Sequence, residues 1–338
     1  MISKTISVVI PNYNDAHVLP IALEAILGQS YPPMEVIIVD DASTDNSIEV
    51  IEDFAKKYSA IKLIRNEVNK GPIYSFRRGW ENIEGDYFYL ASADDKILPG
   101  FFEKSMALLE QYPKAGLCSG ISILDNGEKQ HENPLRPYIA DTPSYLSPEK
   151  VLDAYIKTNE EIVGNTAIWR REPAIETRGF PMELENILDE FTLLMISLNY
   201  GVCFIPEPLA IYNIKATSFS SKYREDPQAL EHLLKKAEVL METTYSNWFP
   251  PAFVEFFKRK NRYLYGVGIL TKLEQSQVEC LQQIEKTLPS QIFLDKIFFK
   301  AAQFPIKFQK IICRIFWLIR KGKFSWYKRR WNNIFSSN

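Results

Sequence analysis

Two pairs of adjacent aspartates follow apolar stretches in the first hundred residues of the chain. The pair Asp40-Asp41 comes directly after one such stretch, and the pair Asp94-Asp95 comes shortly after a second, Tyr87–Leu90. Adjacent carboxylates repel each other, so at the end of a buried strand they need a cation or strong hydrogen-bond donors. Carboxylate oxygens suit Mg²⁺ or Mn²⁺, which are usually shared with a phosphate group. Either pair alone could be a solvated turn, but the repetition favours a site for a phosphate-bearing ligand and a divalent cation.

The segments that carry these residues alternate between strand and helix patterns. Strands are predicted at 6–10, 35–39, 61–64 and 86–90, and helices at 16–28, from 47 onward, at 71–83 and at 99–111. Such alternation needs crossover connections, which predicts a parallel sheet with helices on both faces. The polar clusters 11–14, 40–45 and 92–95 all follow strands. We therefore expect them at the carboxyl edge of the sheet, where ligands bind in folds of this class.

The remainder of the chain is less regular. We predict a strand at 115–123, an irregular loop at 131–148, a helix at 148–158, a strand near 166–169, a helix at 187–199 and a strand at 202–205. Residues 206–221 are predicted to be mostly irregular, and from about 226 the pattern is helical and aromatic with no strand signal. The sequence therefore predicts two domains, residues 1–225 and residues 226–338.

The composition is that of a globular protein. The 338 residues are 46% hydrophobic, with a mean hydropathy of -0.18, which is ample for a large core. Four cysteines lie far apart without metal-finger spacing, which indicates reduced thiols in a cytoplasmic protein. We expect no secretory signal and no membrane-spanning segment, because the best candidate, 311–319, is short and interrupted by Arg314.

The charge is distributed unevenly along the chain. Residues 296–338 hold 11 Lys/Arg and no Asp/Glu, so residues 1–295 hold 29 basic and 42 acidic residues, a net charge of -13. The basic segment is also rich in tryptophan, which favours binding to an anionic membrane surface. The alternative is a basic helix packed on the acidic body. Nothing else in the chain supports nucleic-acid binding, and we predict none.

A set of short motifs gives the chain a resemblance to a known family. The motifs are Ile6–Asn14, Val39–Asp45, Arg65-Asn66, Asn69–Gly71, Gly85–Asp95, Gly164–Arg170, Gly179-Phe180, Asp189-Glu190 and Pro206–Tyr212. Together they resemble, in order, the motifs of the family 2 glycosyltransferases over about residues 4–220. This resemblance implies an α/β fold of the GT-A type, a Rossmann-like nucleotide-diphospho-sugar transferase with a mixed sheet flanked by helices, here with an α-helical C-terminal extension.

The same resemblance implies an activity. The chain would be an inverting, metal-dependent glycosyltransferase that moves one sugar from a nucleotide-diphosphate sugar, with UDP as the expected nucleotide, to an acceptor hydroxyl. The acceptor would be a sugar or a lipid-linked sugar in surface polysaccharide or glycolipid synthesis. The resemblance and the basic tail place the protein in the cytoplasm, peripherally on the inner face of the cytoplasmic membrane. The Gln-x-x-Arg-Trp motif of processive members is absent, which argues for one sugar per encounter.

The resemblance also assigns roles at the donor site. Tyr13 would offer its ring to the base, Pro11 and Asn12 their backbones, and Asp40 an acceptor for a base N–H. Asp94 would meet the ribose or the metal, and Asp95 the metal, Mn²⁺ or Mg²⁺. Lys70, followed by Gly71, would approach the phosphates, although a surface lysine before a helix is the alternative. Asp41 and Asp45 are interpreted as helix-capping or turn acids.

The catalytic base is expected at Asp189 or Glu190. Inverting transfer needs a base that deprotonates the acceptor hydroxyl, and the family usually has Glu-Asp at this point, so the order is reversed here. Position favours Glu190 and side-chain type favours Asp189; we favour Asp189. Without the family context, two acids that complement a helix macrodipole would be the simpler interpretation.

Two other functions are compatible with parts of the sequence. A catalytically inactive relative that binds nucleotide sugars as a membrane-associated scaffold would fit the reversed acids and the absence of a further aspartate at Ser92 or Ala93. A sugar-1-phosphate nucleotidyltransferase would share a related sheet and use Mg²⁺. It would normally have a glycine-rich loop after the first strand, and Pro11–Asn14 contains no glycine.

Overall fold

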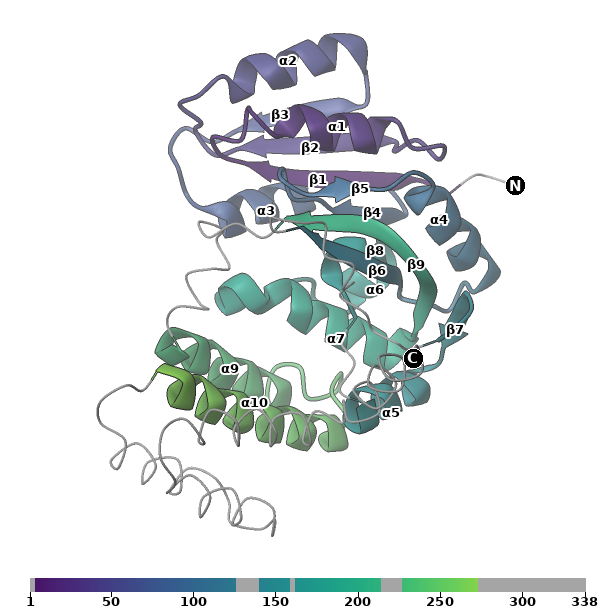
Figure 1. Cartoon of the computed structure of the whole chain (residues 1–338), viewed down its shortest axis with the longest axis vertical. Helices are drawn as coiled ribbons and strands as arrows, with labels where there is room; N and C mark the ends of the chain where they lie inside the picture. Colours follow the sequence, from purple (N-terminus) through teal and green to yellow (C-terminus); the bar gives the residue numbers. More distant parts are fainter. Residues whose placement is uncertain (1–3, 126–139, 159–161, 214–226, 273–338) are drawn as a thin grey trace, which may run out of the picture. The chain divides into compact units, whose positions relative to one another are not determined.

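The computed structural model describes residues 4–125, 140–158, 162–213 and 227–272 (Figure 1). The chain divides into two compact units. The first comprises residues 1–152 and 160–223, and the second comprises residues 153–159 together with 224–338. The candidate site residues named above all belong to the first unit.

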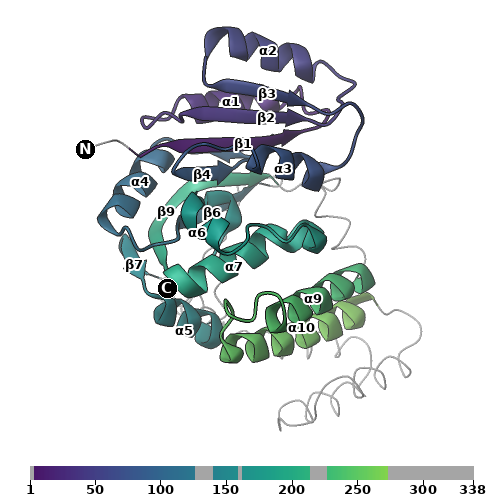
Figure 2. The same cartoon turned by 180° about the vertical axis from the view of Figure 1, so that it is seen from behind.

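The first unit is built around a sheet whose parallel half comes from the first ninety residues. Strands β1 (Ile6–Asn12), β2 (Glu35–Asp40), β3 (Ile61–Arg65) and β4 (Tyr87–Leu90) are all parallel and lie in the order β3-β2-β1-β4 (Figures 1 and 2). The side chains of β1 and β2 are buried almost throughout, as expected for a sheet that is covered on both faces. The predicted strands and their parallel arrangement are confirmed.

Helices cover both faces of this half-sheet. Helices α1 (Leu19–Leu27), α2 (Ser47–Lys57) and α4 (Phe101–Gln111) share one hydrophobic core with Val8 of β1. Helix α3 (Pro72–Trp80) packs on the opposite face, where Val9 points. A Cβ added at Gly79 would lie 2.3 Å from Cγ1 of Val9, so glycine permits this close approach.

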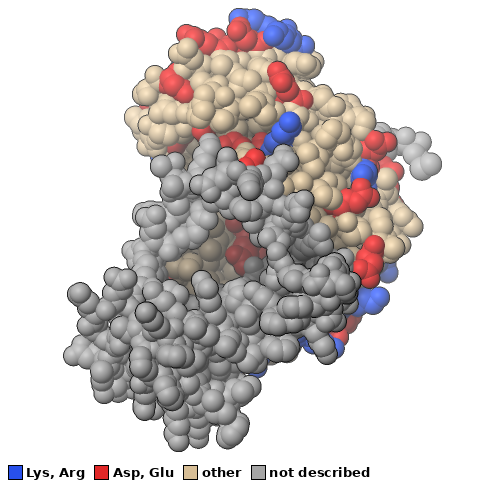
Figure 3. Space-filling view, in the orientation of Figure 1, with Lys and Arg blue, Asp and Glu red and all other residues tan. Residues whose placement is uncertain are grey.

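The outer surface of α2 carries charges of both signs. Lysine and acidic side chains stand next to each other over this helix (Figure 3). Lys56 pairs with Asp53 at 2.7 Å, and both side chains are exposed. An exposed pair of this kind adds little to stability, so the surface is best understood as a solvated helix face.

The second half of the sheet is mixed. After β4 the order continues through β8 (Ile168–Arg170), β6 (Leu117–Asp125), β9 (Val202–Asn213) and β5 (Lys96–Ile97), and β7 (Ser144–Leu146) pairs with β9. Strand β8 runs antiparallel to β4 and β6, whereas β6 and β9 are parallel and β5 and β9 are antiparallel. This arrangement confirms the predicted α/β fold with a mixed sheet flanked by helices.

Two segments predicted to be irregular contain strands. Strand β9 continues through 206–213, and residues 214–221 fall outside the described residues. Strand β7 occupies 144–146 of the predicted loop 131–148, whose residues up to 139 also fall outside the described residues. The prolines at 206 and 208 cannot donate ladder hydrogen bonds, but the pairing of β9 with β6 is bulged there: Gly120 faces Ile205 and Ile121 faces Pro208. A bulge accommodates residues that cannot pair, which is why the strand survives them.

The remaining helices of the first unit lie near its second half-sheet. In chain order they are α5 (Pro148–Thr158), the 3-10 turn η1 (Gly164–Thr166), the short helix α6 (Arg171–Glu176), the 3-10 turn η2 (Met182–Ile187) and α7 (Leu188–Tyr200). Helix α5 is divided between the two units. Helix α7 is buried along most of its length. An aromatic cluster joins α3, β4 and β8 through Trp80, Phe88, Trp169 and Phe180, with Phe88 stacked on Trp169 at 5.9 Å between ring centroids.

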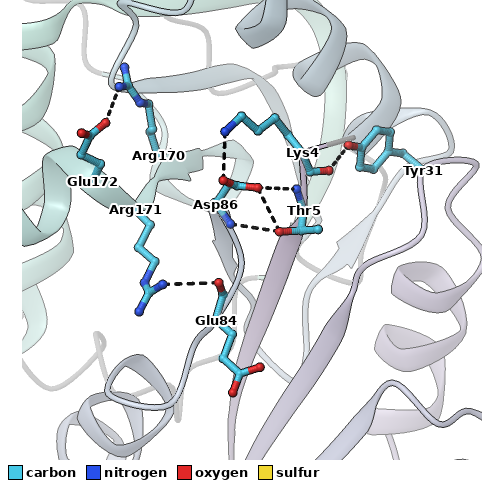
Figure 4. Close-up of polar contacts among 8 residues, drawn as sticks. All are labelled: Lys4, Thr5, Tyr31, Glu84, Asp86, Arg170, Arg171 and Glu172. Carbon is cyan, nitrogen blue, oxygen red and sulfur yellow. Dashed lines mark hydrogen bonds and ion pairs between the residues drawn. The ribbon is translucent and has the colours of Figure 1, made fainter. Parts of the chain in front are cut away.

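The amino ends of β1 and β4 are joined by polar contacts rather than by a ligand site. The Asp86 carboxylate accepts hydrogen bonds from Lys4 Nζ and from the backbone N–H and hydroxyl of Thr5, at 3.0 to 3.1 Å (Figure 4). Arg171 donates to the carbonyl of Glu84 at 3.3 Å (Figure 4). These contacts fix the start of each strand, so the carboxyl ends are held in register with each other.

A buried carboxylate lies nearby at the start of β2. Glu35 accepts hydrogen bonds from the Ser7 hydroxyl, from Lys62 Nζ at 2.7 Å and from the backbone N–H of Glu84 at 2.7 Å. Its side chain is only 2% exposed. Buried charges are tolerated when they are paired and hydrogen-bonded, and this one links the first strands of the sheet.

The second unit contains two long helices. Helix α9 (Pro227–Glu242) and helix α10 (Pro251–Lys272) contact each other, and their buried residues include Leu233, Ala237, Met241, Phe253 and Phe257. Tyr155, from the segment 153–159, packs edge-on against Phe253. The predicted helical character after residue 226 is seen in these two helices, and the basic segment 296–338 lies outside the described residues.

Within the described ranges, the helices are all too short or too polar to cross a bilayer.

Candidate active site

The carboxyl ends of β1 and β2 place Asn12 and Asp40 side by side in the sheet register. Asp40 is 1% exposed. Its Oδ1 accepts hydrogen bonds from Asn12 Nδ2 at 2.8 Å and from the Ser43 hydroxyl at 2.5 Å, and its Oδ2 accepts from the Ser43 N–H at 3.1 Å. The carboxylate is therefore held in one orientation. Tyr13, the next residue after β1, is 45% exposed and follows Pro11 and Asn12 of the strand, which leaves its ring accessible to a planar ligand.

Asp41 has a structural role. Its carboxylate accepts hydrogen bonds from Asn66 Nδ2 at 2.6 Å and from the backbone N–H groups of Lys70 and Gly71 at 2.9 and 2.7 Å. Gly71, with φ of +86°, precedes the first turn of α3, in a conformation that favours glycine. Asp41 thus fixes the loop before α3, so it has the structural role that the sequence predicted, but at a loop 29 to 30 residues further along rather than at the helix that follows it.

Asp45 is likewise a turn acid. It accepts hydrogen bonds at 3.0 Å from the backbone N–H groups of Ala16 and Ser47, and Ser47 begins α2. An acid at a helix start is stabilised by the macrodipole. Asp45 therefore ties the loop after β1 to the start of α2.

Lys70 lies on the surface of the loop that Asp41 holds. Its ammonium group is 4.5 Å from the centre of the Tyr74 ring and donates to the Tyr74 hydroxyl at 3.2 Å. The backbone N–H of Lys70 donates to Asp41, which directly follows β2, and the charge of its side chain lies against an aromatic ring. It has the contacts of an ordinary surface lysine before a helix.

The pair Asp94-Asp95 lies in the short connection between β4 and β5. Asp95 is 7% exposed, and its Oδ1 accepts a hydrogen bond of 3.1 Å from the backbone N–H of Asn213. The side-chain amide of Asn213 donates to the main-chain carbonyl of Asp94. Asp94 accepts a hydrogen bond from the Ser92 hydroxyl. Sequence reasoning did not identify Asn213, because it lies 118 residues from Asp95.

These acids suit a hard divalent cation that a phosphate helps to bind. Two carboxylates on adjacent residues supply oxygen ligands, and within the described residues no group of three His, Cys, Asp or Glu is placed to hold a metal ion. Mg²⁺ typically takes one or two carboxylates and completes its octahedron with phosphate oxygens and water. The residues present therefore fit a cation that arrives with a diphosphate better than a permanently bound one.

Asp189 is the second residue of α7 and is exposed as a residue, while protein atoms crowd around its carboxyl group. Desolvation by the surrounding protein atoms raises the pKa of Asp189, although the backbone N–H groups of Glu190 and Asp189 itself lower it. A Cβ added at Gly164 of η1 would lie 3.5 Å from Asp189 Oδ2. A carboxylate with a raised pKa is suited to general base catalysis. Glu190 is also exposed but is rotated by about 100° around the helix axis from Asp189.

One buried tyrosine links the two acidic groups. Tyr89 of β4 donates a hydrogen bond of 3.0 Å to the carbonyl of Asn165 in η1. Burial raises the pKa of Tyr89, and the nearby charge of Asp95 raises it further. Tyr89 therefore lies between the Asp94-Asp95 connection and the turn that borders Asp189. The sequence offered only a weak signal for it, because Tyr89 is one of two tyrosines in β4, the other being Tyr87.

Comparison with known proteins adds family information to this geometry. Residues 7–179 match the family described as Glycosyl transferase family 2. An uncharacterized glycosyltransferase of Haemophilus influenzae is 33% identical over 248 residues, which cover 69% of this chain and 73% of that protein. The amylovoran biosynthesis glycosyltransferase AmsB of Erwinia amylovora is 27% identical over 227 residues, covering 64% and 72%.

Other relatives match over a shorter segment. EpsE of Bacillus subtilis is 38% identical over 108 residues, which cover 32% of this chain. The matched segment thus spans about two fifths, 39%, of the length of that relative.

Solved structures share the fold. TarS 1-349 of S. aureus in complex with UDP-GlcNAc is similar with a TM-score of 0.67 and 17% identity, over 94% of this chain and 92% of that one. The mannosyltransferase PcManGT of Pyrobaculum calidifontis, in complex with GDP-Man and Mn2+, is similar with a TM-score of 0.57 and 16% identity, over 95% and 88%. At this level of identity the likeness concerns the fold, which is the GT-A type expected from the motifs.

Proposed function

The chain belongs to Glycosyl transferase family 2, and we propose that it transfers one sugar from a UDP-sugar to an acceptor hydroxyl with inversion at the sugar carbon. The observation that carries this proposal is the placement of Asp189. Asp189 is exposed as a residue, desolvation by the protein atoms around its carboxyl group raises its pKa, and it borders the turn that Tyr89 ties to the strand leading to Asp94-Asp95. Direct displacement of the diphosphate by the acceptor hydroxyl needs a base and a donor site that are held by the same part of the protein.

The donor would bind across the carboxyl ends of β1, β2 and β4. Tyr13 would stack on the base, the carboxylate of Asp40 would accept a base N–H, and Pro11 and Asn12 would contribute backbone contacts. Asp94 would contact the ribose or the cation. The fixed orientation of Asp40 supports this role, because a preorganised acceptor loses little entropy on binding.

The diphosphate would lie near Asp94-Asp95, with Lys70 and Gly71 at its margin. Asp95 and Asp94 are the residues that would hold Mn²⁺ or Mg²⁺. When bound, the cation would supply positive charge that offsets the negative charge of the departing diphosphate. Lys70 would have to leave Tyr74 to reach the phosphates.

Asp189 would act on the acceptor. Its carboxylate would take the proton of the acceptor hydroxyl while that oxygen attacks the anomeric carbon from the face opposite the diphosphate. The sugar–oxygen bond to the acceptor forms as the bond to the diphosphate breaks, so the configuration inverts. Glu190 would add negative charge beside Asp189, or would itself be the base in place of Asp189. Gly164 leaves the space beside Asp189 Oδ2 unfilled by a side chain.

The biological setting is proposed from relatives and from sequence. TarS was solved with UDP-GlcNAc, which supports UDP as the nucleotide, and AmsB is named for amylovoran biosynthesis, which supports a role in polysaccharide synthesis. The acceptor we propose is a sugar or a lipid-linked sugar. The basic aromatic segment 296–338 would bind the protein to the anionic inner face of the cytoplasmic membrane.

Calorimetric titration of the full chain with UDP, GDP and dTDP, each with and without Mn²⁺, tests the donor site. We expect tight binding of UDP that depends on Mn²⁺. A preference for GDP or dTDP would correct the nucleotide, and no binding of any of the three would overturn the proposal. For a donor sugar that is turned over, proton NMR of the new glycosidic bond then tests inversion.

A further inference from the structure

Asn213 contacts the Asp94-Asp95 connection through two separate atoms. Its backbone N–H donates to Oδ1 of Asp95 at 3.1 Å, and its side-chain amide donates to the main-chain carbonyl of Asp94. A main-chain carbonyl only accepts hydrogen bonds, so the amide must present its NH₂ group there. One residue therefore holds both the backbone and a carboxylate of the acidic pair.

The sheet explains how a residue so distant in sequence reaches this position. Asn213 is the last residue of β9, which pairs with β6 up to Asp125 and also with β5, where Lys96 faces Ile211. The bulge opposite Gly120 and Ile121 changes the course of β9 before it meets β5. Bulges often re-aim a strand beside an active site, and here the strand ends against the residue that precedes β5.

The two hydrogen bonds restrict different degrees of freedom. The bond to the Asp94 carbonyl fixes the peptide plane between the two aspartates, and so the direction in which each side chain leaves the backbone. The bond to Asp95 Oδ1 fixes the plane of that carboxylate. Adjacent carboxylates would otherwise turn away from each other, because like charges repel.

We propose that Asn213 is a positioning residue that sets the Asp94-Asp95 pair in the geometry that receives a divalent cation with the donor diphosphate. This inference rests on the proposed function. Only the side-chain bond can be removed by substitution, since the backbone N–H remains in every residue except proline. Groups that orient metal ligands typically contribute 10–100-fold to metal affinity, so the side chain should matter for the cation more than for the nucleotide.

The test compares Asn213→Ala with a matched asparagine. Asn199 is also half-buried and donates its amide to a main-chain carbonyl, that of Met195 at 2.7 Å, within α7. The full chain and both variants are titrated with UDP at several Mn²⁺ concentrations, and their thermal unfolding is recorded. We expect the Mn²⁺-dependent affinity for UDP to fall about tenfold or more in Asn213→Ala and to be unchanged in Asn199→Ala. Weak UDP binding without Mn²⁺ should be the same in all three.

Other outcomes would overturn the inference in distinguishable ways. If Asn213→Ala binds UDP with Mn²⁺ as tightly as the wild type, Asn213 is not a positioning residue, and the proposed function stands. If the variant loses melting temperature but keeps the Mn²⁺-dependent affinity while folded, its role is structural only. If the wild type binds no nucleotide, the donor site itself is wrong and the inference falls with it.

Discussion

The hydroxyl of Tyr89 donates a hydrogen bond of 3.0 Å to the main-chain carbonyl of Asn165. Tyr89 belongs to β4, which leads to Asp94-Asp95, and Asn165 belongs to η1, which borders Asp189. This bond thus joins the strand of the proposed donor site to the turn beside the proposed base, in addition to the pairing of β4 with β8, the strand that follows η1.

Tyr89→Phe removes only this bond. We expect kcat to fall several-fold while the affinity for UDP with Mn²⁺ is retained, because misplacement of a base slows the reaction without weakening donor binding. The free energy of unfolding should fall by about 1 kcal/mol. Steady-state kinetics and calorimetry measure the two effects separately. An equal loss of donor affinity and kcat would show that Tyr89 shapes the donor site instead.

Asp189→Asn should slow transfer strongly and spare donor binding. General base catalysis contributes about 10²–10⁴-fold to rate, so we expect a loss of that size in kcat with UDP affinity unchanged. Glu190→Gln is the matched variant and should lose much less. The reverse order of the two losses would assign the base to Glu190.

The raised pKa of Asp189 predicts a pH dependence of the wild-type rate. Only the deprotonated carboxylate accepts a proton, so kcat/KM should fall as pH decreases through the raised pKa. The acidic limb of the pH–rate profile should therefore lie above 3.8, the ordinary pKa of an aspartate. It should disappear from the residual activity of Asp189→Asn. An acidic limb that persists in this variant would belong to another group.

Asp95→Ala should abolish the Mn²⁺-dependent part of UDP binding and leave the protein folded. The reason is the loss of one of only two carboxylates that the described connection between β4 and β5 offers to a cation. Asp53→Ala, on the exposed face of α2, is the control and should bind UDP as the wild type does. Unchanged Mn²⁺-dependent affinity in Asp95→Ala would remove Asp95 from the proposed site.

Glu35 predicts acid sensitivity of the fold. Burial by itself raises the pKa of Glu35, but the hydrogen bonds from Lys62, Ser7 and the Glu84 N–H outweigh it, so the pKa lies below 4.5, the ordinary value of a glutamate. A folded-state pKa below the unfolded one stabilises the protein above the unfolded pKa, and this stabilisation is lost as pH falls through the folded-state pKa. Glu35→Gln should thus cost about 2 kcal/mol at neutral pH and progressively less below pH 4.5.

Urea denaturation at a series of pH values measures this difference. Asp53→Asn, which removes an exposed ion pair, serves as the control and should leave the pH dependence of stability almost unchanged. A constant difference between the wild type and Glu35→Gln across the pH range would contradict the assignment.

The sequence predicted the parallel half of the sheet and the residues at its carboxyl edge. Asp40 and Asp94-Asp95 could be placed because periodicity locates strand ends, and strand ends in a parallel sheet share an edge. Asp45 could be assigned to a helix start because it directly precedes a helical pattern. Local pattern was sufficient for these residues, but not for Asp41, which holds a loop 29 to 30 residues further along the chain.

Contacts between distant segments could not be predicted in this way. Asn213 and Tyr89 act across 118 and 76 residues, and their partners follow from the order of strands in the mixed half of the sheet, which no local pattern encodes. The prolines at 206 and 208 led us to predict an irregular segment. The bulge that accommodates them is formed with another strand, β6, and therefore could not be predicted from the local sequence.

The five residues from Ala91 to Asp95 connect two strands that are both hydrogen-bonded into the same sheet, β4 through β1 and β5 through β9. A short segment anchored at both ends has few conformations to lose. The conformational entropy of the two repelling carboxylates is therefore lost when the protein folds. Ordering them does not lower the affinity for each donor molecule. Lengthening this connection by a residue or two would shift that entropy from folding to binding, and the affinity for the donor would fall even with every aspartate in place.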